Sequence, residues 1–133
     1  MSPVAPRVGI VLVSHSVRLA EGAAELAAQV SGGTVRVLAA GGTEDGTLGT
    51  SLEKVTQAVA VAEAGAGVLV LPDLGSAVLT VRAMLADEPG ARVVLADGPF
   101  VEGAVAATVT AAAGADLKTV AQAAEEAWHA RKL

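Results

Sequence analysis

The chain has 133 residues, a length that suits one domain with a single hydrophobic core. Its formal net charge is −5 and its nine Lys and Arg residues are scattered, which disfavours a nucleic-acid partner, because binding to phosphate backbones depends on clustered cations. It contains no cysteine, so disulfides, thiolate zinc sites and cysteine nucleophiles are excluded. Its two histidines lie far apart in the sequence, which disfavours a histidine-based metal site. We therefore expect no metal site.

Hydrophobic residues make up 53% of the chain, but it has one Phe, one Trp and no Tyr, so the core must be built from Val, Leu and Ala. The longest uncharged stretch, residues 103–115, is shorter than the ~20 apolar residues that a membrane span needs. Residues 1–6 lack the features of a secretory signal. We expect a cytoplasmic protein without a membrane partner, in which residues 1–6 form a tail and residues 7–133 a single domain.

Short runs rich in β-branched residues recur along the chain and are nearly continuous in apolar residues, as is typical of strands buried on both faces. They are residues 8–13, 34–39, 67–71 and 92–96. The segments between and after them have helical periodicity, and the third helix is expected over residues 76–87, before Pro89 and Gly90. The residues expected to face inward are Leu19, Ala23, Leu26, Ala27 and Val30; Leu52, Val55, Val59 and Ala62; Val101, Ala104, Val105, Thr108, Val109 and Ala112; and, after an N-cap at Asp116, Leu117, Val120, Ala121, Ala124 and Trp128.

The alternation of strands and helices, with an extra helix at the end, predicts an α/β fold. We expect an open, mainly parallel four-stranded sheet of order 2-1-3-4 with helices on both faces. In such a sheet the ligand crevice opens between strands 1 and 3, at their carboxyl ends.

His15 follows the first predicted strand and Asp73 follows the third, so the two side chains should face each other across this crevice. A neutral imidazole nitrogen can attack a phosphoryl group while a carboxylate holds the other ring N–H. This interpretation makes His15 and Asp73 the candidate catalytic pair. The alternatives are a structural role for His15 and an N-cap role for Asp73 in the third helix.

The loops after the first three strands end at helix starts, whose free amides bind anions without Lys or Arg. Ser16 and Ser76 are candidate N-caps, and Thr50 with Glu53 has the spacing of a capping box. The glycine-rich loop 41–51 matches neither the dinucleotide-binding nor the Walker A pattern. The candidate phosphate-binding residues are Ser16, Gly42, Thr43, Gly75 and Ser76.

Other polar and aromatic residues near these loops have simpler explanations. Arg18 and Arg82 either screen phosphate charge or are solvated surface residues. We interpret Trp128 as a core anchor and not as a platform for a ligand.

Several motifs taken together resemble a known family, the DhaM phosphoryl-donor subunits of bacterial dihydroxyacetone kinases, which are mannose-type IIA domains of the sugar phosphotransferase system. The segments that carry the resemblance are residues 11–16 (VLVSHS), 19–22 (LAEG), 41–46 (GGTEDG), 49–51 (GTS), 73–80 (DLGSAVLT) and 99–105 (PFVEGAV). The resemblance runs from about Val8 to the last helix.

The resemblance implies a mannose-type IIA fold, usually a homodimer, and a phosphohistidine carrier without a bound cofactor. It implies that the phosphocarrier HPr phosphorylates His15 at Nε2, that Asp73 orients the ring, and that the phosphoryl group passes to ADP on the kinase nucleotide-binding subunit. Pro72 departs from the family pattern, in which a methionine is expected, and its missing N–H could shift the Asp73 loop.

Two other functions fit parts of this pattern. A IIA component of a mannose-type sugar transporter would share the chemistry, although the loops at residues 41–43 and 73–76 disfavour it. A non-catalytic flavodoxin-like binding module would lack a covalent step, and the scarcity of aromatic residues counts against a flavin. For the carrier, we expect a docking surface of apolar residues that includes Val17, Leu48, Leu74 and Val101.

Overall fold

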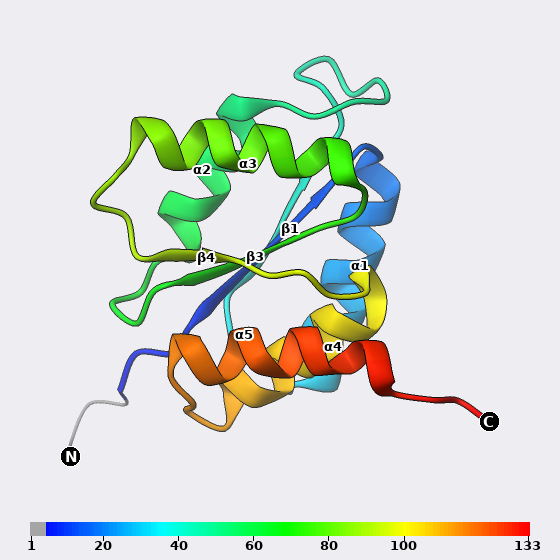
Figure 1. Ribbon diagram of the computed structural model, residues 1–133, viewed down its shortest axis with the longest axis vertical. Helices are drawn as coiled ribbons and strands as arrows, with labels where there is room; N and C mark the ends of the chain where they lie inside the picture. The colour runs from blue at the N-terminus through cyan, green and yellow to red at the C-terminus, as the bar shows by residue number, and fades with distance from the viewer. Residues whose placement is uncertain (1–4) are drawn as a thin grey trace.

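The computed structural model describes residues 5–133, so residues 1–4 of the expected N-terminal tail lie outside the described part of the chain. Strands and helices alternate as predicted (Figure 1). The elements are β1 (Gly9–Ser14), α1 (Val17–Val30), β2 (Val37–Gly41), α2 (Leu52–Ala62), β3 (Val68–Pro72), α3 (Gly75–Asp87), β4 (Val93–Leu95), α4 (Phe100–Ala112), α5 (Leu117–Glu126) and a 3₁₀ turn (Ala127–His129). The second strand begins at Val37, later than predicted, because its ladder with β1 starts at the pair Ile10 and Val37.

The four strands form one parallel sheet of order β2-β1-β3-β4, as the sequence predicts. β1 lies in the middle and pairs with β2 on one side and with β3 on the other, so the winding direction reverses between β1 and β3. The loops after β1 and β3 therefore meet at the carboxyl end of the sheet, at the upper right of Figure 1.

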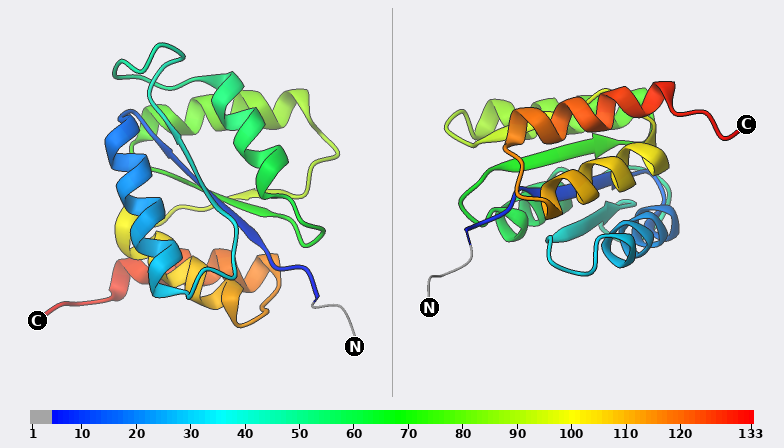
Figure 2. Two further views of the ribbon diagram at one scale, coloured as in Figure 1. Left: turned by 180° about the vertical axis from the view of Figure 1, so that it is seen from behind. Right: turned by 90° about the horizontal axis from the view of Figure 1, so that it is seen from below.

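Alternating side chains of β1 contribute to two separate cores. Ile10 and Leu12 point to the face covered by α1, α4 and α5, whereas Val11 and Val13 point to the face covered by α2 and α3. All four side chains are fully buried. The result is a three-layer arrangement, visible in the left view of Figure 2, that holds the ends of β1 and β3 in place.

Helices α1 and α4 pack mainly through alanines, which corrects the inward faces predicted for them. In α2 the predicted Val55, Val59 and Ala62 are buried, and in α5 the predicted Val120, Ala121 and Ala124 are buried. In α1 the buried residues are Ala20, Ala23, Ala24 and Ala27, whereas Leu19, Leu26 and Val30 are 44%, 45% and 53% exposed. In α4, Val101 and Val109 likewise point outward and Ala104, Ala107 and Ala111 are buried. Small side chains let the axes of these helices approach the sheet closely. The close packing favours burial of alanine on the inner face, even where leucine or valine is available one turn away.

Trp128 is not a core anchor, contrary to the prediction. Its side chain is 60% exposed, and its Nε1 donates a hydrogen bond to the carbonyl oxygen of Asp97 at 3.0 Å. The α-helical period ends at Glu126, and the 3₁₀ turn that follows rotates the indole out of the inner face. Within residues 5–133, no helix combines the length and the apolar character needed to cross a bilayer.

Candidate functional site

His15 and Asp73 come directly after β1 and β3, and the structure brings their side chains together. Nδ1 of His15 lies 2.9 Å from Oδ1 of Asp73. The amide of Asp73 donates to the carbonyl oxygen of Val13 at 2.9 Å, so the residue is held by the β1–β3 ladder and not by a free loop. The rigid sheet thus sets the position of the carboxylate relative to the imidazole.

The Asp73 carboxylate accepts hydrogen bonds at both oxygens. Oδ1 accepts from His15 Nδ1 at 2.9 Å and from the Leu74 amide at 2.7 Å, and Oδ2 accepts from the Ser14 hydroxyl at 2.9 Å and from the His15 amide at 3.0 Å. The side chain is 8% exposed. Burial raises the pKa of Asp73, but the donors from His15, Ser14 and Leu74 outweigh burial and hold the pKa below its ordinary value. Asp73 is therefore a carboxylate at neutral pH.

This contact determines which ring nitrogen of His15 carries the proton. Because an ionised carboxylate can only accept, Nδ1 of the neutral ring must carry the hydrogen and Nε2 must present a lone pair. The hydroxyl of Ser76 lies 2.5 Å from Nε2 and donates to it. The His15 side chain is 25% exposed, and the Ser76 hydroxyl is the contact that Nε2 makes.

Two helices begin beside the imidazole. Ser16 is the N-cap of α1, as predicted, and its hydroxyl accepts from the Leu19 amide at 3.2 Å. Ser76 is not an N-cap: α3 begins at Gly75 after Leu74, without a side-chain cap, and the Ser76 hydroxyl bonds to His15 instead. Among the described residues, no acceptor lies within hydrogen-bond distance of the amides of Gly75 and Ser76. These amides can bind an anion on Nε2.

The alternative role of Asp73 as the N-cap of α3 is also wrong, because Leu74 occupies the N-cap position. The predicted cap of α2 is displaced by one residue. Ser51 caps α2 by accepting from the Lys54 amide at 3.2 Å, while the hydroxyls of Thr50 and Thr80 lie 2.6 Å apart and link the loop to α3.

The amides of Gly42 and Thr43 already have acceptors, in β1 and in their own loop respectively. Gly42, at φ +74°, donates to the carbonyl oxygen of Ser14 at 3.0 Å, and Thr43 donates to that of Thr47 at 2.9 Å. Gly49 donates to the carbonyl oxygen of His15 at 2.9 Å. Loop 42–51 therefore shapes the surroundings of His15, whereas the amides of Gly75 and Ser76 at the start of α3 have no acceptor among the described residues.

Asp45 holds this loop together at its tip. Its Oδ1 accepts from the hydroxyls of Thr43 and Thr47 at 2.6 and 2.8 Å and from the Thr47 amide at 3.2 Å. These bonds lower the pKa of Asp45 to about 2. The loop is thus ordered by an ionised carboxylate although it is exposed to solvent.

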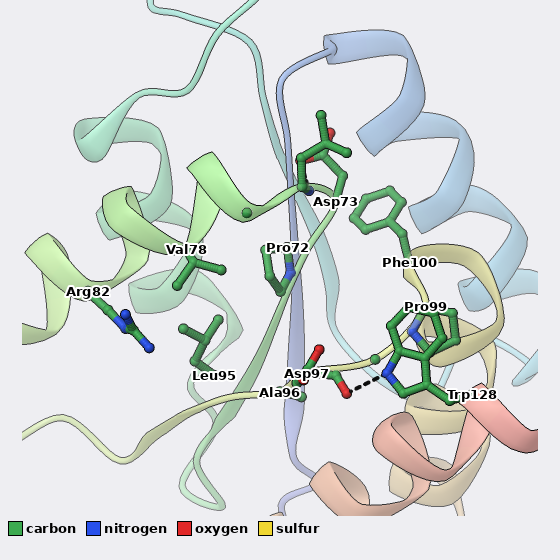
Figure 3. A pocket seen from close by; sticks show the side chains of 13 residues that line it. Pro72, Asp73, Val78, Arg82, Leu95, Ala96, Asp97, Pro99, Phe100 and Trp128 are labelled. Atoms are coloured by element: carbon green, nitrogen blue, oxygen red, sulfur yellow. Dashed lines mark hydrogen bonds between the residues drawn. The ribbon is translucent and has the colours of Figure 1, made fainter.

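A pocket of about 490 Å³ adjoins Asp73, beyond the point where the β3–β4 ladder ends (Figure 3). Arg82 lies on one side of it, and Phe100 and Trp128 lie on the other.

Pro72 does not disturb the contact between Asp73 and β1. Backbone amides along β3 point alternately to its two neighbours: the amide of Val68 points to β4 and that of Asp73 points to β1. The nitrogen of Pro72 therefore points toward β4, at a position beyond the last residue of β3 that pairs with β4. Its missing N–H instead coincides with the end of that ladder.

The remaining candidates have no side chain among the hydrogen-bond partners of His15 and Asp73. Arg18 and Arg82 are exposed. Of the apolar residues expected to dock partners, Leu48 and Leu74 are 81% and 62% exposed, Val101 is 39% exposed and Val17 is half-buried. Within residues 5–133 no cluster of three metal-binding side chains is present.

Ser14 is the site residue that sequence reasoning missed. It is completely buried, and its hydroxyl donates to Asp73 while accepting from the Ser16 amide at 3.0 Å. The only available signal was a polar residue at the end of an otherwise apolar strand.

The chain matches the family model described as "PTS system fructose IIA component" over residues 9–121. It is 43% identical over 119 residues to the phosphoryl donor subunit DhaM of the PEP-dependent dihydroxyacetone kinase of Escherichia coli, covering 85% of this chain and 25% of that protein. Shorter relatives are covered almost completely. They are a DhaM of Listeria innocua (36% identity, 77% of this chain and 84% of the relative) and one of Lactococcus lactis (32%, 89% and 94%).

A crystallised protein described as of unknown function superimposes with a TM-score of 0.77 at 31% identity, covering 91% of this chain and 95% of that one. The fold and the family model together define a mannose-type IIA domain of the phosphotransferase system. Within this class, the chain belongs to the family of DhaM phosphoryl-donor subunits. It spans about a quarter of the length of the Escherichia coli relative, at 25%.

Proposed function

We propose that this chain is a phosphohistidine carrier in a phosphoenolpyruvate-dependent dihydroxyacetone kinase system. His15 accepts a phosphoryl group from phospho-HPr and donates it to ADP on the kinase nucleotide-binding subunit. The observation that carries the proposal is the bonding of the His15 ring: Nδ1 contacts Asp73 and Nε2 faces the surface beside α3. The names of the relatives support the dihydroxyacetone kinase system over other acceptors.

The proposed reaction needs no proton transfer to or from His15. The Nε2 lone pair attacks phosphorus in line with the nitrogen of the donor histidine, so one N–P bond forms as the other breaks. The ring retains its Nδ1 proton and becomes positively charged, and the Asp73 carboxylate stabilises that charge. In the second step a terminal phosphate oxygen of ADP attacks phosphorus and releases neutral His15, giving ATP on the partner.

The phosphoryl oxygens need donors at the start of α3. We assign this role to the amides of Gly75 and Ser76 and to the Ser76 hydroxyl, which must rotate away from Nε2 when the phosphoryl group arrives. A Cβ built on Gly75 would meet no atom within 4 Å, so the surface at the first residue of α3 is open. Ser16 caps the helix that starts on the other side, and Gly42 and Thr43 shape the adjacent loop.

Transfer between two histidines requires the donor protein to come close to His15. We assign the docking surface to the exposed apolar residues Leu48, Leu74 and Val101 together with Val17, which lie in the loops or first helical turns that follow the strands. The same proposal includes a homodimer, as in other mannose-type IIA domains. Sedimentation velocity or light scattering checks the dimer, and a monomer at micromolar concentration contradicts it.

A reconstituted transfer assay tests the function. The protein is incubated with phosphoenolpyruvate, enzyme I and HPr, and intact mass is expected to show one added phosphate that is labile to acid. The His15→Ala variant should show no adduct, whereas His129→Ala, the matched control at the other histidine, should be phosphorylated normally. If active donors give no adduct, the carrier function is wrong and a non-catalytic binding module takes its place.

The acceptor is identified in a second step. The phosphorylated protein is mixed either with the kinase nucleotide-binding subunit loaded with ADP or with a IIB protein of a mannose-type transporter. We expect rapid loss of the phosphate and formation of ATP only in the first mixture. Transfer only to the IIB protein would contradict the dihydroxyacetone kinase assignment and support a transporter component.

A further inference from the structure

Ser14 joins the Asp73 carboxylate to the start of α1 through one hydroxyl group. Its Oγ donates to Oδ2 of Asp73 at 2.9 Å and accepts from the amide of Ser16 at 3.0 Å. The side chain is fully buried, and the hydroxyl uses its single donor and one acceptor site in these two bonds. A buried hydroxyl with both bonds made has a defined orientation, so it constrains both partners.

We propose that Ser14 is a positioning residue for phosphoryl transfer, which holds the Asp73 carboxylate in the orientation that keeps the His15 proton on Nδ1. This inference rests on the proposed function, but it assigns a role to a residue that does not contact the phosphoryl group. The carboxylate of Asp73 can rotate about its Cβ–Cγ bond unless both oxygens are held. Oδ1 faces His15, and Oδ2 is held by the Ser14 hydroxyl and the His15 amide.

The geometry also explains why a hydroxyl is needed at the end of an apolar strand. Without it, the half-buried amide of Ser16 loses its acceptor, and Oδ2 keeps only the His15 amide as a donor. The carboxylate then keeps three of its four donors and is held less firmly, so its contact with Nδ1 weakens and the other tautomer of His15 becomes more populated. Among the described residues, His15 is the only titratable side chain in contact with Asp73, so a change in either group reports on this pair.

The test compares Ser14→Thr with Ser14→Val. These variants have nearly the same shape and suit a strand equally, but only threonine retains the hydroxyl. The ¹⁵N spectrum of histidine-labelled protein gives the tautomer of His15, with His129 as an internal reference. Phosphorylation by phospho-HPr, followed by intact mass from pH 4 to pH 8, gives the rate and its dependence on pH.

For Ser14→Thr we expect the wild-type tautomer, rate and pH profile. For Ser14→Val we expect a mixture of tautomers, phosphorylation slower by about ten-fold, and an acid limb displaced to higher pH, because the carboxylate has lost one donor. Equal tautomer populations and equal rates for the two variants would overturn the proposal, even if Ser14→Val melts at a lower temperature.

The two proposals fail in different ways. If the wild-type protein accepts no phosphate, the carrier function fails, whereas the tautomer comparison still measures the effect of Ser14 on the His15–Asp73 pair. If phosphorylation occurs and the tautomer is insensitive to the hydroxyl, only the role of Ser14 fails. Ser14→Ala, whose smaller side chain fits without strain, replaces the valine variant if the latter does not fold.

Discussion

The hydroxyl oxygen of Ser76 lies 2.5 Å from Nε2 of His15, while Asp73 lies 2.9 Å from Nδ1 of the same ring. Each nitrogen of the imidazole therefore has one partner, and the two partners have opposite roles. Asp73 accepts a hydrogen bond and keeps the proton on Nδ1, and Ser76 donates to the lone pair that would attack phosphorus. This arrangement leads to specific predictions for variants near the site.

Replacing Ser76 by alanine should make the phosphorylated state less stable relative to the free state. The hydroxyl bonds a neutral nitrogen before transfer and a charged phosphoryl oxygen after it, and hydrogen bonds to charged groups are stronger by about 1 kcal/mol. We expect the equilibrium fraction transferred from phospho-HPr to shift about five-fold toward unphosphorylated protein. Intact mass at equilibrium measures this shift, and an equilibrium unchanged from wild type would show that the hydroxyl does not bind the phosphoryl group.

Replacing Asp73 by asparagine should slow phosphorylation without unfolding the protein. The amide has nearly the same shape but carries no charge, so it cannot stabilise a positively charged ring. A hydrogen bond to a charged group contributes about 1.5–3 kcal/mol, which corresponds to a rate lower by roughly 10- to 150-fold. Quenched-flow mass measurements give the rate and circular dichroism checks the fold; wild-type kinetics would leave Asp73 with only a structural role.

The pKa of Asp73 also predicts how stability depends on pH. Because the folded-state pKa lies below the unfolded value, Asp73 stabilises the fold fully above its unfolded pKa, and this contribution is lost as the pH falls through the folded pKa. Wild type should therefore lose more stability than Asp73→Asn between pH 6 and pH 3. Urea unfolding at the two pH values measures this difference, and parallel losses would show that the carboxylate is not preferentially ionised in the folded state.

Asp45 should control the order of loop 42–51. Its pKa of about 2 predicts that the Thr47 amide resonance titrates near pH 2 and not near the ordinary value of 3.8. Asp45→Asn should abolish this titration and increase hydrogen exchange at Thr47, because its amide loses an ionised acceptor. Nuclear magnetic resonance measures both effects. A midpoint near 3.8 in the wild type would mean that the threonine hydroxyls do not hold the carboxylate in solution.

Two glycines near α1 should respond in opposite ways to alanine. A Cβ at Gly41 would lie 2.6 Å from the carbonyl oxygen of Ser16 and 2.8 Å from Cα of Val17, both backbone atoms, so Gly41→Ala should destabilise the fold by about 1–3 kcal/mol. A Cβ at Gly22 would meet nothing within 4 Å, so Gly22→Ala should stabilise α1 by roughly 0.5–1 kcal/mol. Urea unfolding compares the two, and a stabilising Gly41→Ala would contradict the close approach of β2 to α1.

The order of strands and helices could be predicted because it depends on local patterns. Apolar runs such as residues 8–13 are typical of buried parallel strands, and their spacing leaves room only for crossover helices. The switch point between the first and third strands follows from the order of the strands. That order also implies that His15 and Asp73 lie at the same end of the sheet.

The sequence by itself thus determined the layered parallel sheet and the two polar residues at its carboxyl edge. Only the tertiary structure decided which helical side chains are buried and which hydrogen bonds the serine hydroxyls make. Alanines of α1 are buried while Leu19 and Leu26 are exposed. The distance between a helix and the sheet depends on how all three layers pack together, which the sequence of one helix does not reveal. The hydrogen bonds from Ser14 to Asp73 and from Ser76 to His15 join residues that are 59 and 61 positions apart in the sequence. Local sequence periodicity carries no information about contacts over such separations.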